Sequence, residues 1–197
     1  MVGRVCPQRA AEHPFVRGWD KKQSATTYPT TVRAVWTLAG ITFGFRLAEP
    51  TPDLLERGIK GRDDSLAWWD DNIELLFDVT GKNEGEFYHL IINANNAVAD
   101  ARGKDFSKDF PQIKSAVFVG TNFWSMEVYV PYAAFPESAK PGAGSSTVWS
   151  GNFTRHRVAD QGLNRNHAVG PPPSRRLTPS KRGGGAHFPQ RNMFTEW

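Results

Sequence analysis

A period-two alternation at residues 72–78 constrains the fold of this 197-residue chain more than any other stretch. Apolar side chains occupy every second position and polar ones fall between them, with Leu76 the exception. A period of two is typical of a β-strand with one face in the core. The strand is therefore expected to turn Ile73, Leu75 and Phe77 inward and Asn72, Glu74 and Asp78 to the opposite side.

Several other short segments alternate in the same way between clusters of turn residues. Strands are expected at 31–36, 41–47, 86–93, 97–100, 115–119, 123–130 and 148–156, with single helical turns within 52–61 and 132–135. The inward sets include Tyr88, Leu90 and Ile92 on one strand and Trp124, Met126, Val128 and Val130 on another. Short strands at turn-punctuated intervals, without helical periodicity or repeats, predict an all-β fold, an antiparallel β-sandwich.

The length suits a single domain over residues 1–197. Its core is expected at about 30–157. A long irregular N-terminal segment precedes the core, and a loop-rich C-terminal segment at 158–197 follows it, because Pro, Gly and Ser dominate there.

Composition removes several classes of function. The single cysteine, Cys6, excludes an intrachain disulfide. No apolar run reaches the length of about eighteen residues that a membrane span needs, and residues 1–11 lack the apolar segment of a signal peptide. The net charge is +4, and the basic residues are scattered through Pro/Gly-rich sequence without a nucleic-acid motif. We therefore expect neither a membrane nor a nucleic acid as partner.

The loop before the alternating strand carries Trp68, Trp69, Asp70 and Asp71. An indole offers a flat apolar surface to the C–H face of a pyranose, and carboxylates accept hydrogen bonds from its hydroxyls. This combination suits a sugar. Adjacent residues at the mouth of a strand point in opposite directions, so one Trp is expected to be buried and the other presented.

With its segments in this order, the chain resembles the family 9 carbohydrate-binding modules. The resemblance covers roughly residues 30–157, and its most specific part is Asp-Asn-Ile-Glu-Leu-Leu-Phe-Asp following a Trp, at 71–78. The hairpin 31–45, the strand 88–93, the strand 124–131 and the segment 151–155 match in the family's order. The resemblance implies a β-sandwich that binds sugars without cleaving them, often at chain ends, and that is often appended to a secreted glycosidase.

The resemblance also implies site residues. A Trp that stacks on the sugar corresponds by spacing to Trp68, and a glutamate that bonds hydroxyls corresponds to Glu74. Polar groups on two further strands correspond to His89, Asn93, Asn152 and Thr154. With the loop residues and one substitute ring, the candidate carbohydrate-binding set is Trp68, Trp69, Asp71, Glu74, His89, Asn93, Asn152, Thr154 and Phe188.

Two departures from the family stand out. The family's site arginine falls at Ile91, and its second tryptophan, which faces the first, has no counterpart, so Phe188 is the expected opposing ring. No cofactor is required for binding. A structural calcium ion, which accompanies some family members, is the ion that the acidic middle of the chain would take, although it has no EF-hand spacing.

Two alternative functions start from the same residues. A glycoside hydrolase would use Glu74 with Glu127 or Asp71 as acid and base, if the two carboxyls lay about 5 to 9.5 Å apart. A domain for acidic glycans would instead use Arg155, Arg157 and Arg165 to pair with uronic acids.

The preferred interpretation is a non-catalytic module that binds oligosaccharides or polysaccharides of plant type, derived from cellulose or xylan. Its expected location is secreted or at the cell surface, and its expected partner protein is a glycoside hydrolase.

Overall fold

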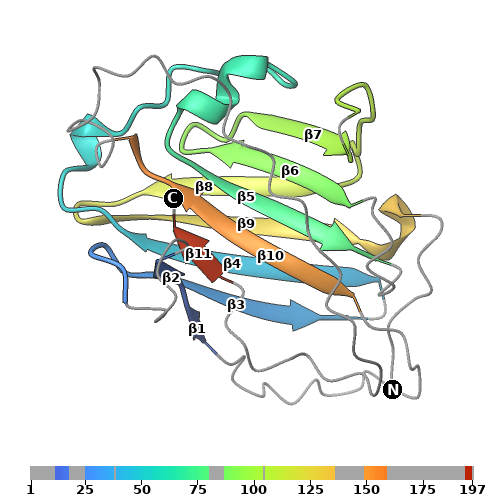
Figure 1. The fold of residues 1–197 in the computed structure, drawn as a ribbon, viewed down its shortest axis with the longest axis horizontal. Helices are drawn as coiled ribbons and strands as arrows, with labels where there is room; N and C mark the ends of the chain where they lie inside the picture. Colours follow the sequence, from blue (N-terminus) through green and yellow to red (C-terminus); the bar gives the residue numbers. More distant parts are fainter. Residues whose placement is uncertain are drawn as a thin grey trace, which may run out of the picture.

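The computed structural model describes residues 12–17, 25–37, 39–79, 87–103, 105–135, 149–158 and 194–196, and it confirms the all-β sandwich. One sheet has the strand order β1-β3-β4-β9-β8 and the other has the order β2-β11-β10-β5-β6-β7 (Figure 1). The first sheet comprises β1 (His13–Pro14), β3 (Thr30–Trp36), β4 (Gly40–Ala48), β9 (Phe123–Pro131) and β8 (Lys114–Val119). The second comprises β2 (Val16–Arg17), β11 (Phe194–Glu196), β10 (Ser150–His156), β5 (Asn72–Asp78), β6 (Tyr88–Asn93) and β7 (Val98–Arg102).

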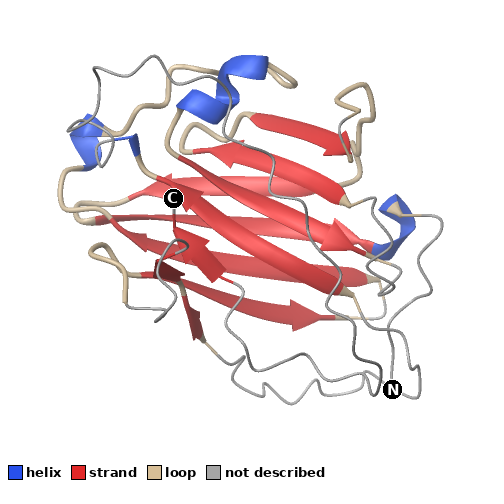
Figure 2. Ribbon diagram, in the orientation of Figure 1, coloured by secondary structure: helices blue, strands red, loops and turns tan. Residues whose placement is uncertain are grey.

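Neighbouring strands are antiparallel, except that β11 runs parallel to both β10 and β2. Within the described ranges, the short 3-10 helices η1 (Pro52–Leu54), η2 (Ser65–Trp69) and η3 (Tyr132–Ala134) lie at the rim of the sandwich (Figure 2). No helix within the described ranges is long and apolar enough to cross a membrane.

Three short strands lie within the end segments that the sequence predicts to be irregular. β1 pairs with β3, so that His13 lies opposite Val32, and β2 and β11 extend the second sheet. These strands have two or three residues each, which is too short for an alternating pattern to show. A proline in β1 is tolerated because this strand lies at the edge of its sheet.

The core lies between the two sheets and follows the predicted inward sets. Ile73, Leu75, Leu90, Ile92, Trp124, Met126, Val128 and Val130 are all buried. Aromatic rings join the two sheets: Phe43 of β4 lies 5.5 Å from the ring centroid of Phe77 on β5 and 5.0 Å from that of Phe153 on β10. Such contacts between apolar rings stabilise the sandwich by burial and by packing.

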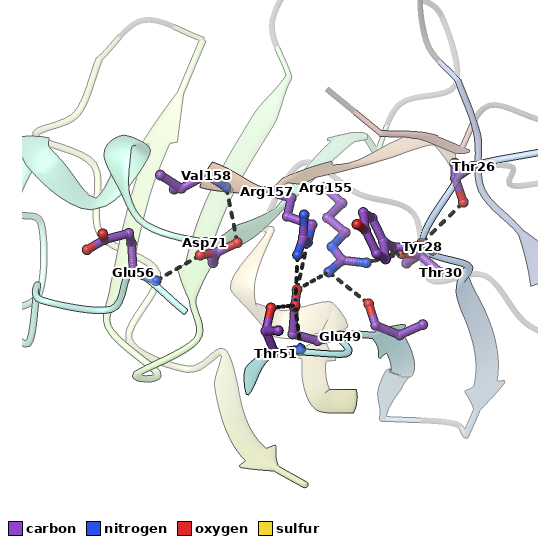
Figure 3. Close-up of polar contacts among 11 residues, drawn as sticks. Thr26, Tyr28, Thr30, Glu49, Thr51, Glu56, Asp71, Arg155, Arg157 and Val158 are labelled. Carbon is purple, nitrogen blue, oxygen red and sulfur yellow. Dashed lines mark hydrogen bonds and ion pairs between the residues drawn. The ribbon is translucent and has the colours of Figure 1, made fainter. Parts of the chain in front are cut away.

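A buried ion cluster ties both sheets to the loop after β4 (Figure 3). Glu49 accepts hydrogen bonds from Nε and Nη2 of Arg157, at 2.7 and 2.8 Å, and from Nη2 of Arg155, at 3.2 Å. Arg155 also donates to the Tyr28 carbonyl and to Oγ1 of Thr30. All three charged side chains are at most 5% exposed, so each depends on its partners for compensation.

Candidate functional site

The two adjacent tryptophans lie on η2, which begins at a capped turn. The side chain of Asp64 accepts a hydrogen bond of 2.9 Å from the backbone N–H of Leu66, as an N-cap does. The helix covers the outer face of β6 and β7, where Ala67 packs in one apolar cluster with Ile91 and Ala99. This cover explains why all six residues of β6 are buried, although only one of its faces belongs to the core between the sheets.

Trp69 is the more exposed of the two tryptophans, at 52%, and Trp68 is half-buried. The Trp68 ring stands edge-on to His89, with centroids 5.1 Å apart, and to Phe106, with centroids 5.9 Å apart. Phe106 is 44% exposed and is not among the site residues predicted from the sequence. In the sequence Phe106 is a single phenylalanine within a charged loop. No alternating pattern surrounds it, so nothing in the sequence indicates a contact with Trp68. The two ring centroids are 5.9 Å apart and the ring planes are inclined by 61°, so Phe106 contacts Trp68 directly. This spacing leaves no room for a sugar ring between the two side chains.

Polar side chains line the outer face of the sheet beside Trp68. Nε2 of His89 lies 2.8 Å from Oε2 of Glu74, and the two side chains are 7% and 15% exposed. Thr154 of β10 lies directly opposite Glu74, and Asn152 lies opposite Leu76. Oγ1 of Thr154 and Oδ1 of Asn152 are buried and find no hydrogen-bond partner among the described residues. The predicted residues Trp68, Glu74, His89, Asn152 and Thr154 therefore share one surface.

Asp71 and Asn93 lie elsewhere, in the packing beneath the loops. Asp71 is 1% exposed and accepts from the backbone N–H groups of Glu56, at 2.8 Å, and Val158, at 3.2 Å. Burial raises the pKa of Asp71, against the lowering effect of these hydrogen bonds.

The side chain of Asn93 is fully buried and makes four hydrogen bonds, which hold the loops around it. It donates to Asp70 and to the Ile59 carbonyl, and it accepts from the N–H groups of Asn95 and Ala97. Alternation assigned Asn93 to the outer face of its strand, but alternation carries no information about which loop covers that face. Phe188 lies outside the described residues.

Solved structures of carbohydrate-binding modules share the fold of this chain. A carbohydrate-binding module of family 9 from Caldicellulosiruptor kristjanssonii, in complex with glucose, superposes with a TM-score of 0.52 at 13% identity, over 73% of this chain and 65% of that one. The same kind of module in complex with cellotriose gives 0.51 at 13% identity, over 73% and 64% of the two chains. The chain has the fold of a family 9 carbohydrate-binding module.

A third structure agrees with this family 9 fold. A proposed carbohydrate-binding protein from Bacteroides uniformis superposes with a TM-score of 0.56 at 14% identity, over 74% of this chain and 71% of that one. No protein-family model and no curated protein matches the sequence. At 13–14% identity these superpositions show the fold alone.

The family 9 fold of this chain brings together neither of the two carboxylate pairs expected for a hydrolase. Glu127 is exposed on the outer face of β9, in the sheet opposite to the one that carries Glu74. Because packed sheets lie about 10 Å apart and the two side chains point away from each other, they share no cleft. Asp71, the other candidate partner, is occupied by backbone N–H groups. Both hydrolase pairings are therefore wrong.

The arginines proposed for acidic glycans are also unsuitable. Arg155 and Arg157 are 0% and 4% exposed and belong to the Glu49 cluster. Arg155 alternates with Thr154 along β10, so its side chain points to the opposite face from the candidate site. Arg165 lies outside the described residues.

The described residues include one group of carboxylates that fits a cation. One oxygen from each of Asp63, Asp100 and Asp109 lies within 4.8 Å of the other two. Asp100 is fully buried, and its Oδ1 has no hydrogen-bond partner among the described residues. Burial raises the pKa of Asp100 to about 6, although the nearby charge of Arg62 lowers it. Oxygen ligands of this kind suit the structural calcium ion expected above, which would join the loop before η2 to β7 and to the loop that follows it.

Proposed function

We propose that this domain binds oligosaccharides or the ends of polysaccharides on the outer face of its second sheet, without cleaving them. The observation that carries the proposal is Trp68, a partly exposed indole standing over the His89–Glu74 pair, with the unpartnered Thr154 hydroxyl in the same row of the sheet. An apolar wall beside hydrogen-bonding groups suits a pyranose ring.

Glucose and cellotriose are the ligands bound to the two family 9 structures. They favour neutral sugars of the β-glucan and xylan type as the first ligands to test. Such polymers lie outside the cell, so the proposal includes a secreted or cell-surface location and association with a glycoside hydrolase. Detection of the native protein in the extracellular fraction, and its co-purification with hydrolase activity, would test these two points.

The central experiment measures cellotriose affinity by calorimetry for the wild type and for Trp68→Ala. We expect Trp68→Ala to lose about 1.5 kcal/mol of binding free energy, roughly a tenfold loss of affinity, because the stacking surface is gone. The matched control is Trp36→Ala. Trp36 is 73% exposed at the end of β3 in the other sheet, so its removal should leave affinity unchanged.

Far-ultraviolet circular dichroism and thermal unfolding check that both variants keep the wild-type fold. Equal losses of affinity in the two variants, or no binding of any glucan or xylan oligomer by the wild type, would count against the proposal.

A further inference from the structure

The outer face of the second sheet has an uneven distribution of charge. By strand register, its described positions on β10, β5, β6 and β7 are Ser150, Asn152, Thr154, His156, Asn72, Glu74, Leu76, Asp78, His89, Ile91, Asn93, Ala99 and Ala101. This set contains two carboxylates, Glu74 and Asp78, but neither a lysine nor an arginine. The described positions of this face therefore hold no fixed positive charge beside Glu74.

Several cationic side chains near this face are engaged elsewhere. Arg155 points inward to Glu49, and Arg62 forms ion pairs with Asp63 and Asp100. Arg102 lies opposite Tyr88, in the inward phase of its strand. On the loop that carries Phe106, the Nζ of Lys108 lies 3.8 Å from a carboxylate oxygen of Asp105, so this pair adds no net charge to the rim.

Three side chains of the site carry oxygen atoms that can accept hydrogen bonds. Glu74 accepts through its carboxylate, Asn152 has its unpartnered Oδ1, and Thr154 has an unpartnered hydroxyl that can accept. Thr154 is only 2% exposed. Buried acceptors without partners favour a ligand that supplies several N–H or O–H donors.

We propose that the site selects sugars that carry a free amine, such as oligomers of glucosamine, over neutral sugars, and that it rejects uronic acids. This inference rests on the proposed function and specifies its ligand class. A protonated amine supplies three donors and a positive charge beside Glu74, whereas a uronate brings a second carboxylate to a face that has no described lysine or arginine to pair with it.

The test compares trimers of glucosamine, N-acetylglucosamine, glucose as cellotriose, and galacturonic acid by calorimetry. The measurements are made at about pH 6.5, where carboxyls are ionised and a large fraction of the sugar amines is protonated, since the neighbouring oxygens lower the pKa of these amines well below that of lysine. We expect the glucosamine trimer to bind about tenfold more tightly than cellotriose, as a partly buried charge pair allows. We expect the acetylated trimer to lose this advantage and the galacturonate trimer to show no binding.

Glu74→Gln identifies the group responsible. It should remove the preference for the amine, while Glu127→Gln, an exposed change on the opposite face of the sandwich, should leave it intact. If Glu74→Gln fails to fold, salt provides a second measurement. Raising the salt concentration from about 0.05 to about 0.5 M should weaken the glucosamine trimer and spare cellotriose, because screening acts on the charge pair alone.

The possible failures are distinguishable. Cellotriose binding that equals or exceeds glucosamine binding overturns the amine preference and leaves the proposed function standing. A preference for the amine that survives in Glu74→Gln, or that is insensitive to salt, also overturns it. Failure of all four trimers to bind overturns both the inference and the proposed function.

Discussion

At the scale of single residues, the environment of each charge separates structural from ligand-facing side chains. Glu49 is 2% exposed, and its two oxygens are shared by Arg155, Arg157 and the N–H and hydroxyl of Thr51. Burial alone would raise the pKa of Glu49, but the hydrogen bonds from Arg157 and Thr51 and the charge of Arg157 lower it below the ordinary value. Glu74, in contrast, has His89 as its partner and retains some exposure.

Glu49→Gln should lower the free energy of unfolding by about 3 to 5 kcal/mol, because it removes the carboxylate that two buried guanidinium groups share. Urea denaturation measures the change. The matched control, Glu127→Gln, replaces an exposed carboxylate of the same type on β9 and should change stability by less than about 0.5 kcal/mol. Equal stabilities for the two variants would show that the Glu49 cluster contributes nothing.

At the scale of elements, alternation predicted which strands exist and which of their faces point inward. For β9 the predicted inward residues are the buried ones, and for β5 they are all buried, together with Asn72, which donates to backbone carbonyls of the preceding loop. The pairing of Trp68 with Glu74 was implied by the resemblance to the family 9 modules and not by alternation.

What lies above an outward face depends on contacts between distant segments, and alternation is silent about them. The five-residue helix η2 closes over β6 and brings Trp68 to His89, and the loops at Ile59 and Asp70 enclose Asn93. The contact with Phe106 joins two loops that are far apart in the sequence. The interpretation of Asp71 as a ligand for sugar had the same weakness, since its partners Glu56 and Val158 come from outside the motif.

Asp64→Ala tests whether η2 positions the sugar-binding indole. Loss of the N-cap hydrogen bond should cost about 1 kcal/mol of stability and should also weaken cellotriose binding, because the turn that carries Trp68 becomes less well held. Thermal unfolding and calorimetry measure the two effects. Asp53→Ala is the control, because Asp53 lies in the first turn of η1, which has no side-chain cap bond. A loss of affinity in both variants, or in neither, would argue against this role of the cap.

At the scale of the whole molecule, buried carboxyls make the free energy of unfolding depend on pH in two opposite ways. Burial raises the pKa of Asp100 to about 6 and also raises that of Asp71, so these groups hold protons in the folded state that the unfolded chain would release. Their contribution to stability is greatest below the ordinary Asp value of about 4 and is lost as the pH rises through their folded values. The lowered pKa of Glu49 acts in the opposite direction, since its contribution is lost as the pH falls through the folded value.

Stability should therefore be highest at mildly acidic pH and should fall by about 1 to 3 kcal/mol on going to pH 7. Urea denaturation at a series of pH values measures this fall. Asp100→Asn, which cannot ionise, should flatten the limb between about pH 4 and 7 and leave the acidic limb unchanged. A limb of unchanged slope in this variant would assign the effect to other groups.

The Glu49 cluster also has a consequence for the order of assembly. The hydrogen bonds of Arg155 reach back 106 residues to Glu49 and 127 residues to Tyr28. On a ribosome, a nascent chain exposes Glu49 long before β10 is translated, so this carboxylate stays hydrated until β10 docks. The charges therefore lose their water only when β10 docks, late in folding. Closing so long a loop costs more entropy than closing a hairpin, so this docking step is slow compared with formation of the β3–β4 hairpin.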